Sequence, residues 1–293
     1  MIQTFGLTRH YGKYVAVQDV DMQISAGEIF GFLGLNGAGK TTIMRMICGL
    51  LRPTAGHSQV GPVEVRTPAD AGRLIGILSF VSQEMRFHER ATLSDLLRIY
   101  ATLAQAPLEH GLEFAQQLCV PLDRPCSRLS PGQQRKAQLA IAWLKSPRYL
   151  LLDEPTAGLD PQGVAEVRDI VRALQSSGTT IMFSSHILAE IQDLCTSIGI
   201  LHEGRLHYCG RIAESYTIEL SENEALAVAV LHDAGIQARC APGGIQIDVE
   251  KGDLPAVTRR LIDHGLAPGL VQPTRLEQIF NQAIHSSRGE IAS

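Results

Sequence analysis

One stretch, from Gly34 to Thr42, constrains the fold of this chain more than any other feature. It reads Gly-Leu-Asn-Gly-Ala-Gly-Lys-Thr-Thr and fits the pattern G-x-x-x-x-G-K-[ST]. Residues 28–33, before it, form a short apolar run that predicts a buried strand. Residues 42–50, after it, have apolar side chains at helical spacing and include Gly49, which favours a helix that ends there. The stretch therefore lies in the strand–loop–helix context of a phosphate-binding loop.

The residue types in this loop suit a polyphosphate such as that of ATP. Only a glycine-rich turn lets many backbone N–H groups approach one anion, and the following helix presents its positive end to it. Lys40 would reach the β- and γ-phosphates, and the Thr41 hydroxyl would contact Mg²⁺. The loop residues that we expect to contact the nucleotide are Asn36, Gly37, Ala38, Gly39, Lys40, Thr41 and Thr42.

An aromatic residue upstream is a candidate for the adenine. Tyr11 and Tyr14 flank Gly12-Lys13 in a polar turn, and an aromatic ring there can stack on a base. A tyrosine beside a glycine is also common in turns that bind nothing. Because the phosphate-binding loop follows downstream, we assign Tyr11 to the nucleotide.

The composition is that of a globular protein with no reason to bind nucleic acid. The chain has 293 residues, of which 45% are hydrophobic, and a net charge of −4. This length suits one large or two unequal domains, whereas nucleic-acid binding favours a basic protein. No apolar run approaches the ~20 residues that span a bilayer, and no secretory signal is visible. The six cysteines form no C-x-x-C pair, which favours reduced thiols in a cytosolic protein.

Strand and helix patterns alternate from residue 28 to 201, which predicts an α/β fold with a parallel sheet and ligands at the carboxyl ends of its strands. Residues 2–27 read as further short strands, and residues 52–61 as a loop. The predicted strands that follow are 74–81, 149–152 and 179–183, with a hairpin formed by 197–201 and 206–208. The predicted helices are 93–103, 111–118, 134–144, 161–174 and 187–195. We place a domain at 1–212, with a helical lobe over about 86–146.

The remaining residues, 213–293, predict a small accessory α+β domain. Strand patterns cover 216–220, 236–240, 245–249 and 267–271, and helical patterns cover 223–234, 254–264 and 275–285. The order strand, helix, strand, strand, helix, strand is that of the ferredoxin-like arrangement.

Three further motifs give the chain a specific resemblance. Residues 129–133 read Leu-Ser-Pro-Gly-Gln, residues 150–160 read Leu-Leu-Leu-Asp-Glu-Pro-Thr-Ala-Gly-Leu-Asp, and residues 184–186 read Ser-Ser-His. With the phosphate-binding loop, these motifs resemble the ATP-binding subunit of an ABC transporter over residues 1 to about 210. The run 184–190, the segment 201–205 and the accessory tail with its apolar helix at 276–280 are similar to exporters of the drug-resistance type. The tail also has a plainer interpretation, as a packing or dimer-stabilising appendage that binds no ligand.

The resemblance implies a role for each motif residue in ATP hydrolysis. Asp153 would hold Mg²⁺ together with Thr41 and Gln83, and Glu154 would orient or deprotonate the attacking water. Gln83 and His186 would complete the catalytic set, with His186 bonded to the γ-phosphate and to Glu154. The residues implied to act on the nucleotide of a second copy are Ser130, Gly132, Gln133 and Asp160. Taken alone, each motif has a plainer interpretation as a helix cap, turn or surface residue.

Pro131 departs from the family's signature, which usually has glycine there. Proline lacks an N–H group, so one potential phosphate donor is missing from the loop. Ser130 and Gly132 remain, so we expect the protein to hydrolyse ATP. The effect of Pro131 is expected on the rate of hydrolysis.

The leading hypothesis is an ATPase that dimerises on ATP and drives a separate integral membrane permease, as an exporter. We expect such a protein to be cytoplasmic and peripheral on the inner face of the cell membrane. One alternative is a soluble ABC-type ATPase not coupled to transport. However, the chain has neither the coiled-coil insertion of repair members nor the second cassette of translation members. Another alternative is a P-loop kinase, which leaves residues 129–133 and Asp160 unexplained.

Overall fold

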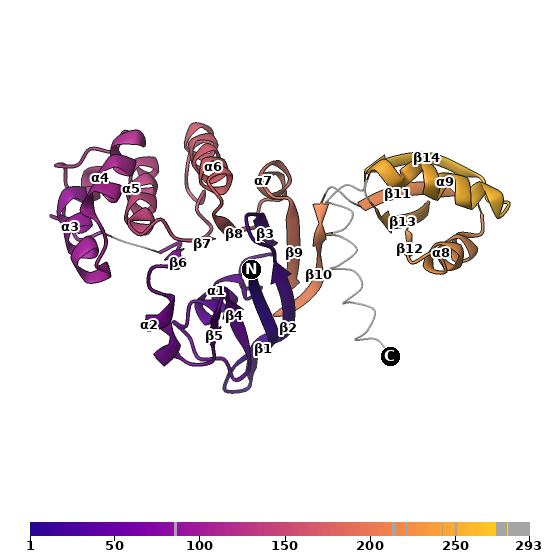
Figure 1. The fold of residues 1–293 in the computed structure, drawn as a ribbon, viewed down its shortest axis with the longest axis horizontal. Helices are drawn as coiled ribbons and strands as arrows, with labels where there is room; N and C mark the ends of the chain where they lie inside the picture. Colours follow the sequence, from indigo (N-terminus) through magenta and orange to yellow (C-terminus); the bar gives the residue numbers. More distant parts are fainter. Residues whose placement is uncertain are drawn as a thin grey trace. The chain divides into compact units, whose positions relative to one another are not determined.

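The computed structural model describes residues 1–84, 87–212, 215–220, 222–241, 243–249, 251–273 and 280 (Figure 1). The chain divides into two compact units, Met1–Cys209 and Gly210–Ser293. This division falls close to residue 212, where the sequence places the boundary.

A six-stranded sheet forms the centre of the first unit. Its strands are β3 (Ile29–Leu33), β6 (Leu78–Val81), β7 (Tyr149–Asp153), β8 (Thr180–Ser185), β9 (Ser197–His202) and β10 (Arg205–Arg211). The strand order is β10-β9-β3-β8-β7-β6, and the pairs from β9 to β6 are parallel. Every residue of β3, β7 and β8 is buried, which agrees with the near-continuous apolar character of parallel strands covered on both faces. The predicted parallel sheet is therefore confirmed.

A second, antiparallel sheet carries the start of the chain. It contains β1 (Ile2–Tyr11), β2 (Tyr14–Ile24), β4 (Ala55–Val60) and β5 (Val63–Val65), in the order β2-β1-β4-β5. The prediction of a loop over 52–61 is wrong, because β4 pairs with β1 from Ile2↔Val60 to Thr8↔Ala55. The sequence of β4 has few β-branched or aromatic residues, so its strand conformation depends on this non-local pairing.

Helices pack against the sheets of the first unit (Figure 1). They are α1 (Lys40–Ile47), α2 (Ala71–Leu74), α6 (Pro161–Ser176) and α7 (Leu188–Leu194), with a 3₁₀ turn at Pro68–Asp70. The strand predicted over 74–81 is wrong in its first half. Helix α2 ends at Leu74, and Gly76 adopts a left-handed φ of 97° that turns the chain before β6 begins.

A helical lobe follows β6 and has its own apolar core. It consists of α3 (Leu93–Ala104), α4 (Leu108–Gln117) and α5 (Pro131–Trp143), with a 3₁₀ turn at Cys126–Arg128. Leu93, Leu97 and Ala137 are among the buried residues of this core. The predicted start of α3 at residue 93 is confirmed, because the Thr92 hydroxyl accepts from Asp95 N at 3.1 Å. Helix α5 begins earlier than the predicted residue 134, because Ser130 caps it with Pro131 at its first position.

The second unit has the predicted ferredoxin-like topology. Its elements are β11 (Ser215–Leu220), α8 (Glu224–His232), β12 (Gln237–Ala241), β13 (Gly244–Asp248), a 3₁₀ turn (Lys251–Asp253), α9 (Leu254–Asp263) and β14 (Pro268–Pro273). The antiparallel strand order is β12-β13-β11-β14, which places the third strand between the first and second as in a split βαβ unit. The helix predicted over 275–285 lies outside the described residues, apart from Phe280. Within the described parts of the chain, no helix combines the length and apolar character needed to cross a membrane.

Candidate active site

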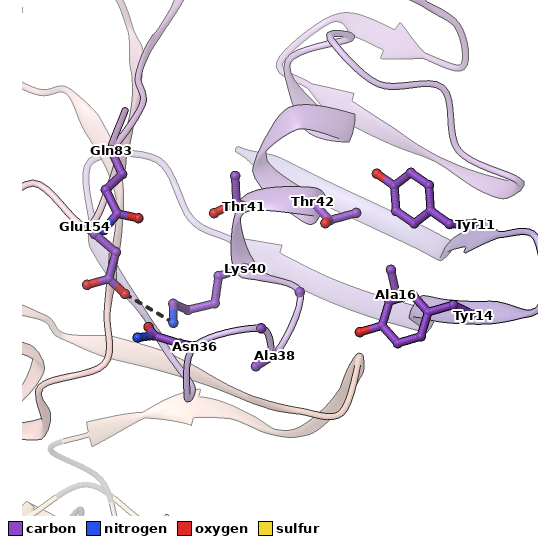
Figure 2. Close-up of a pocket in the computed structure, with 12 residues that line it drawn as sticks. Tyr11, Tyr14, Ala16, Asn36, Ala38, Lys40, Thr41, Thr42, Gln83 and Glu154 are labelled. Atoms are coloured by element: carbon purple, nitrogen blue, oxygen red, sulfur yellow. Dashed lines mark ion pairs between the residues drawn. The ribbon is translucent and has the colours of Figure 1, made fainter. Parts of the chain in front are cut away.

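The phosphate-binding loop joins β3 to α1 and borders a cavity of about 390 Å³ (Figure 2). Gly39, which precedes α1, has a φ of 106°, and a Cβ atom there would lie 2.7 Å from Ala16 O. Only glycine therefore fits this position. The residues that line the cavity are Tyr11, Tyr14, Ala16, Asn36, Gly37, Ala38, Gly39, Lys40, Thr41, Thr42, Gln83 and Glu154.

Lys40 is held by the loop and by one carboxylate. Its Nζ donates to Gly34 O at 2.5 Å and to Leu35 O at 3.3 Å, and lies 3.2 Å from Glu154 Oε1. Figure 2 shows this ion pair reaching across the cavity from the start of α1. Both side chains are 6% exposed, so bulk water does not screen either charge. Each charge is stabilised by its contact with the other, and removing one partner would leave the other buried and unpaired.

Asp153, at the end of β7, is linked to two hydroxyl groups. Thr41 Oγ1 donates to Asp153 Oδ2 at 2.7 Å, and Ser184 Oγ donates to Oδ1 at 2.9 Å. Carboxylate and hydroxyl oxygens are hard ligands of the kind that Mg²⁺ prefers, in a site that nucleotide phosphates and water would complete. The donor set of Thr41 and Asp153 therefore fits Mg²⁺.

Glu154 and His186 form a bonded pair beside Lys40. Glu154 Oε2 lies 2.7 Å from His186 Nδ1, while the Glu154 N–H donates to Ser184 Oγ at 2.9 Å. Glu154 has a φ of 47°, a left-handed conformation that is uncommon for a residue other than glycine. The adjacent strand ends of β7 and β8 thus bring together two residues that are 32 positions apart in sequence.

Gln83 reaches the same cavity from the end of β6, as the sequence predicts for a residue that follows a parallel strand. Arg135, on α5, lies close by and was not predicted from the sequence. Its Nη1 donates to Gln138 Oε1 at 2.8 Å, and the guanidinium approaches the carbonyl oxygens of Ser82 and Glu154. Burial lowers the pKa of Arg135, and the charge of Asp153 opposes this effect.

Both tyrosines of the first hairpin line the cavity, on the side away from Gln83 (Figure 2). Tyr11 and Tyr14 are directly opposite each other in the β1–β2 pairing. The guanidinium of Arg9 lies 4.5 Å from the centre of the Tyr11 ring, which is a cation–π contact. The sequence prediction assigned only Tyr11. The strand pairing across Gly12-Lys13 is the signal that places Tyr14 beside it.

The four remaining predicted residues line a separate groove of about 540 Å³, together with Cys119 and Lys136. These four residues are Ser130, Gly132, Gln133 and Asp160. Ser130 Oγ accepts from Gln133 N at 3.2 Å, and Asp160 Oδ1 accepts from Gly163 N at 2.7 Å, so both cap helices. None of the four lines the cavity of the phosphate-binding loop in the described structure.

Comparisons with known proteins agree on one family. Residues 17–157 match the family described as ABC transporter. The lipopolysaccharide export system ATP-binding protein LptB of Acidithiobacillus ferridurans is 34% identical over 72% of this chain and 90% of its own length. The bacitracin transport ATP-binding protein BcrA of Bacillus licheniformis is 36% identical over 70% of this chain and 68% of its own length.

The fold is that of an ATP-binding cassette. A dimeric structure of a bacterial ABC transporter cassette superposes with a TM-score of 0.65 at 20% identity, over 72% of this chain and 98% of that chain. The motif order, the sheet topology and the similarity to LptB and BcrA therefore converge. This chain belongs to the ABC transporter family of ATP-binding proteins.

Proposed function

We propose that this chain binds and hydrolyses ATP with Mg²⁺, dimerises on ATP, and drives a separate membrane permease that exports its substrate. One observation carries the proposal. Thr41 contacts Asp153 at 2.7 Å and Lys40 contacts Glu154 at 3.2 Å, and Glu154 in turn contacts His186 at 2.7 Å.

Each of these residues has a distinct task in hydrolysis. Lys40, Thr42 and the loop N–H groups bind the phosphates, while Tyr11 and Tyr14 border the base end of the cavity. Thr41, Asp153 and Gln83 would hold Mg²⁺, which would neutralise charge on the phosphates. The Ser184 hydroxyl fixes the orientation of the Asp153 carboxylate.

Glu154 is the residue that we assign to water activation. Its carboxylate is buried but borders the cavity, and its second oxygen is bonded to His186. A γ-phosphate at Lys40 would compete with Glu154 for the ammonium group and free one carboxylate oxygen to accept a proton from water. His186 then orients the other oxygen through its Nδ1–H.

The separation of the two sites within one chain supports the dimer. Ser130, Gly132, Gln133 and Asp160 line a groove distinct from the cavity of Lys40. A second copy would bring that groove over the nucleotide of the first. The Ser130 hydroxyl accepts from Gln133 N and so keeps its own proton for a phosphate oxygen.

The assignment to export rests on the relatives. LptB is named for lipopolysaccharide export and BcrA for bacitracin transport, and they match 72% and 70% of this chain. We place this protein at the inner face of the cell membrane, held there by the permease. The alternative is an ABC-type ATPase that is not coupled to transport.

Two measurements test this function. Phosphate release from ATP, with and without EDTA, tests hydrolysis and its Mg²⁺ dependence, and release that requires a phosphate acceptor would instead indicate a kinase. Purification of the tagged protein from membranes, followed by identification of bound integral membrane proteins, tests the coupling. Recovery of an active ATPase with no permease bound would favour the uncoupled alternative.

A further inference from the structure

Glu190 is a buried carboxylate close to the Glu154–His186 pair that the mechanism above does not use. It lies in the first turn of α7 and is 5% exposed. Glu190 Oε2 accepts two hydrogen bonds, from Thr156 Oγ1 at 2.8 Å and from Ser185 Oγ at 2.7 Å. The ion pairs found among the described residues do not include Glu190. A carboxyl group buried without hydrogen bonds is costly to desolvate, and these two hydroxyl bonds offset part of that cost.

The two hydroxyl groups belong to the two segments that carry the catalytic pair. Thr156 lies two residues after Glu154, and Ser185 directly precedes His186. Ser185 Oγ also accepts from Ile187 N at 3.0 Å. It therefore fixes the backbone on both sides of His186.

These contacts close a ring between the ends of two neighbouring strands. Strands β7 and β8 are parallel neighbours up to the pair Asp153↔Ser184. Beyond that pair, the Glu154–His186 contact joins the two chain segments directly, and Glu190 joins them through Thr156 and Ser185. The separation of Glu154 and His186 thus depends on the acceptor atom that Glu190 supplies.

We propose that Glu190 is a positioning residue, which sets the geometry of Glu154 and His186 through Thr156 and Ser185 and so controls the rate of hydrolysis rather than nucleotide affinity. The proposal rests on the ATPase function above. Glu190 itself does not line the nucleotide cavity, so its effect on the reaction is indirect. Small displacements of catalytic groups are expensive, since ~1 Å of misplacement costs about 100-fold in rate.

Two substitutions at the same position separate geometry from charge. Glu190→Met keeps the length of the side chain and removes the acceptor, so kcat should fall about tenfold to a hundredfold while KM for ATP stays within about twofold. Glu190→Gln keeps an amide oxygen that accepts both hydroxyl bonds, so kcat should stay within about threefold of the parent. Equal losses in both variants would overturn the proposal, because an acceptor alone would then be insufficient.

Two further variants deal with folding. Thr156→Val removes one of the two hydrogen bonds to Glu190 and keeps a side chain of similar shape. This variant should lower kcat, but by less than Glu190→Met does. Leu194→Ala, on the buried side of the same helix, should lower the melting temperature and leave kcat per folded molecule unchanged. If Glu190→Met and Thr156→Val lose activity only in proportion to the folded fraction, as Leu194→Ala does, the role is structural and the proposal is wrong.

A structural readout keeps this test separate from the ATPase function. Crystal structures of the Glu190 variants without nucleotide should show the contact between Glu154 Oε2 and His186 Nδ1 lengthened in Glu190→Met and kept in Glu190→Gln. An unchanged contact in Glu190→Met would overturn the positioning role, whatever the activity. Failure of the parent protein to release phosphate from ATP would instead count against the proposed function.

Discussion

Lys40 and Glu154 neutralise each other across the cavity, with Lys40 Nζ 3.2 Å from Glu154 Oε1 and both side chains 6% exposed. We assign these residues to phosphate binding and to water activation. Their contact means that a bound γ-phosphate must exchange with a carboxylate for the same ammonium group. If these assignments are right, nucleotide binding also releases the Glu154 carboxylate from Lys40.

Lys40→Ala should weaken ATP binding by about 10- to 150-fold. The variant removes a charge-assisted contact to phosphate, and such contacts contribute ~1.5–3 kcal/mol. Titration with a fluorescent ATP analogue measures the affinity. Lys145→Ala removes the same charge outside the cavity and should bind as the parent does. If Lys40→Ala binds with parental affinity, the nucleotide site is assigned incorrectly.

Glu154→Gln should lower the rate of hydrolysis about 100-fold or more and hold the protein as an ATP-bound dimer. The amide cannot accept the proton of the attacking water, a role that contributes about 10²- to 10⁴-fold. Phosphate release and size-exclusion chromatography with ATP measure both effects. Glu109→Gln, at an exposed position of α4, is the control. Hydrolysis by Glu154→Gln at the parental rate would show that another group activates the water.

Pro131→Ala and Pro131→Gly should both hydrolyse ATP faster than the parent. Pro131 is the first residue of α5 and has no N–H, and the Gln133 N–H is bonded to Ser130. Gly132 therefore supplies the free N–H of this turn, and either substitution adds one more donor for the partner's phosphate. Steady-state kcat measures the gain. A kcat that is unchanged or lower in both variants would mean that the Pro131 position does not face the phosphate.

ATP should protect Cys119 from alkylation in the Glu154→Gln background. Cys119 is exposed on the groove with Ser130 and Asp160, which the proposed dimer would cover. Cys240 is exposed in the second unit and should react equally with and without ATP.

The buried cysteines Cys48 and Cys195 should react only after unfolding. Burial raises the pKa of both thiols, and the charge of Glu190 raises the pKa of Cys195 further.

Mass spectrometry of the labelled peptides at neutral pH measures each cysteine separately. Equal labelling of Cys119 with and without ATP, under conditions where ATP is bound, would contradict the arrangement of the dimer. Rapid labelling of Cys48 in the folded protein would contradict its burial.

Features set by neighbouring residues could be predicted from the sequence. The glycines and Lys40 of the phosphate-binding loop, the capping of α5 by Ser130 and the strand end before Asp153 each depend on contacts within a few residues. The order of elements in the second unit was also predictable, because each of its strands and helices has a clear periodicity.

Features that depend on pairing between distant residues could not be predicted from the sequence. Strand β4 has little strand propensity of its own and forms because β1 pairs with it. The turn at Gly76 interrupts an apolar run that reads as one strand. Arg135 lies outside the motifs, and Glu190 ends the run 184–190 without a role assigned from the sequence, so the contacts of both residues become visible only in the structure.

The sequence by itself determined the motifs, and with them the prediction of which residues carry the chemistry, because the motifs consist of local backbone geometry and adjacent side chains. The tertiary structure decided how those residues meet. Strand β8, late in the chain, lies between β3 and β7 and supplies Ser184 and His186 to the strand ends beside it. The contact between Thr41 and Asp153 joins residues 112 positions apart, and only the strand order of the folded sheet brings them within hydrogen-bonding distance.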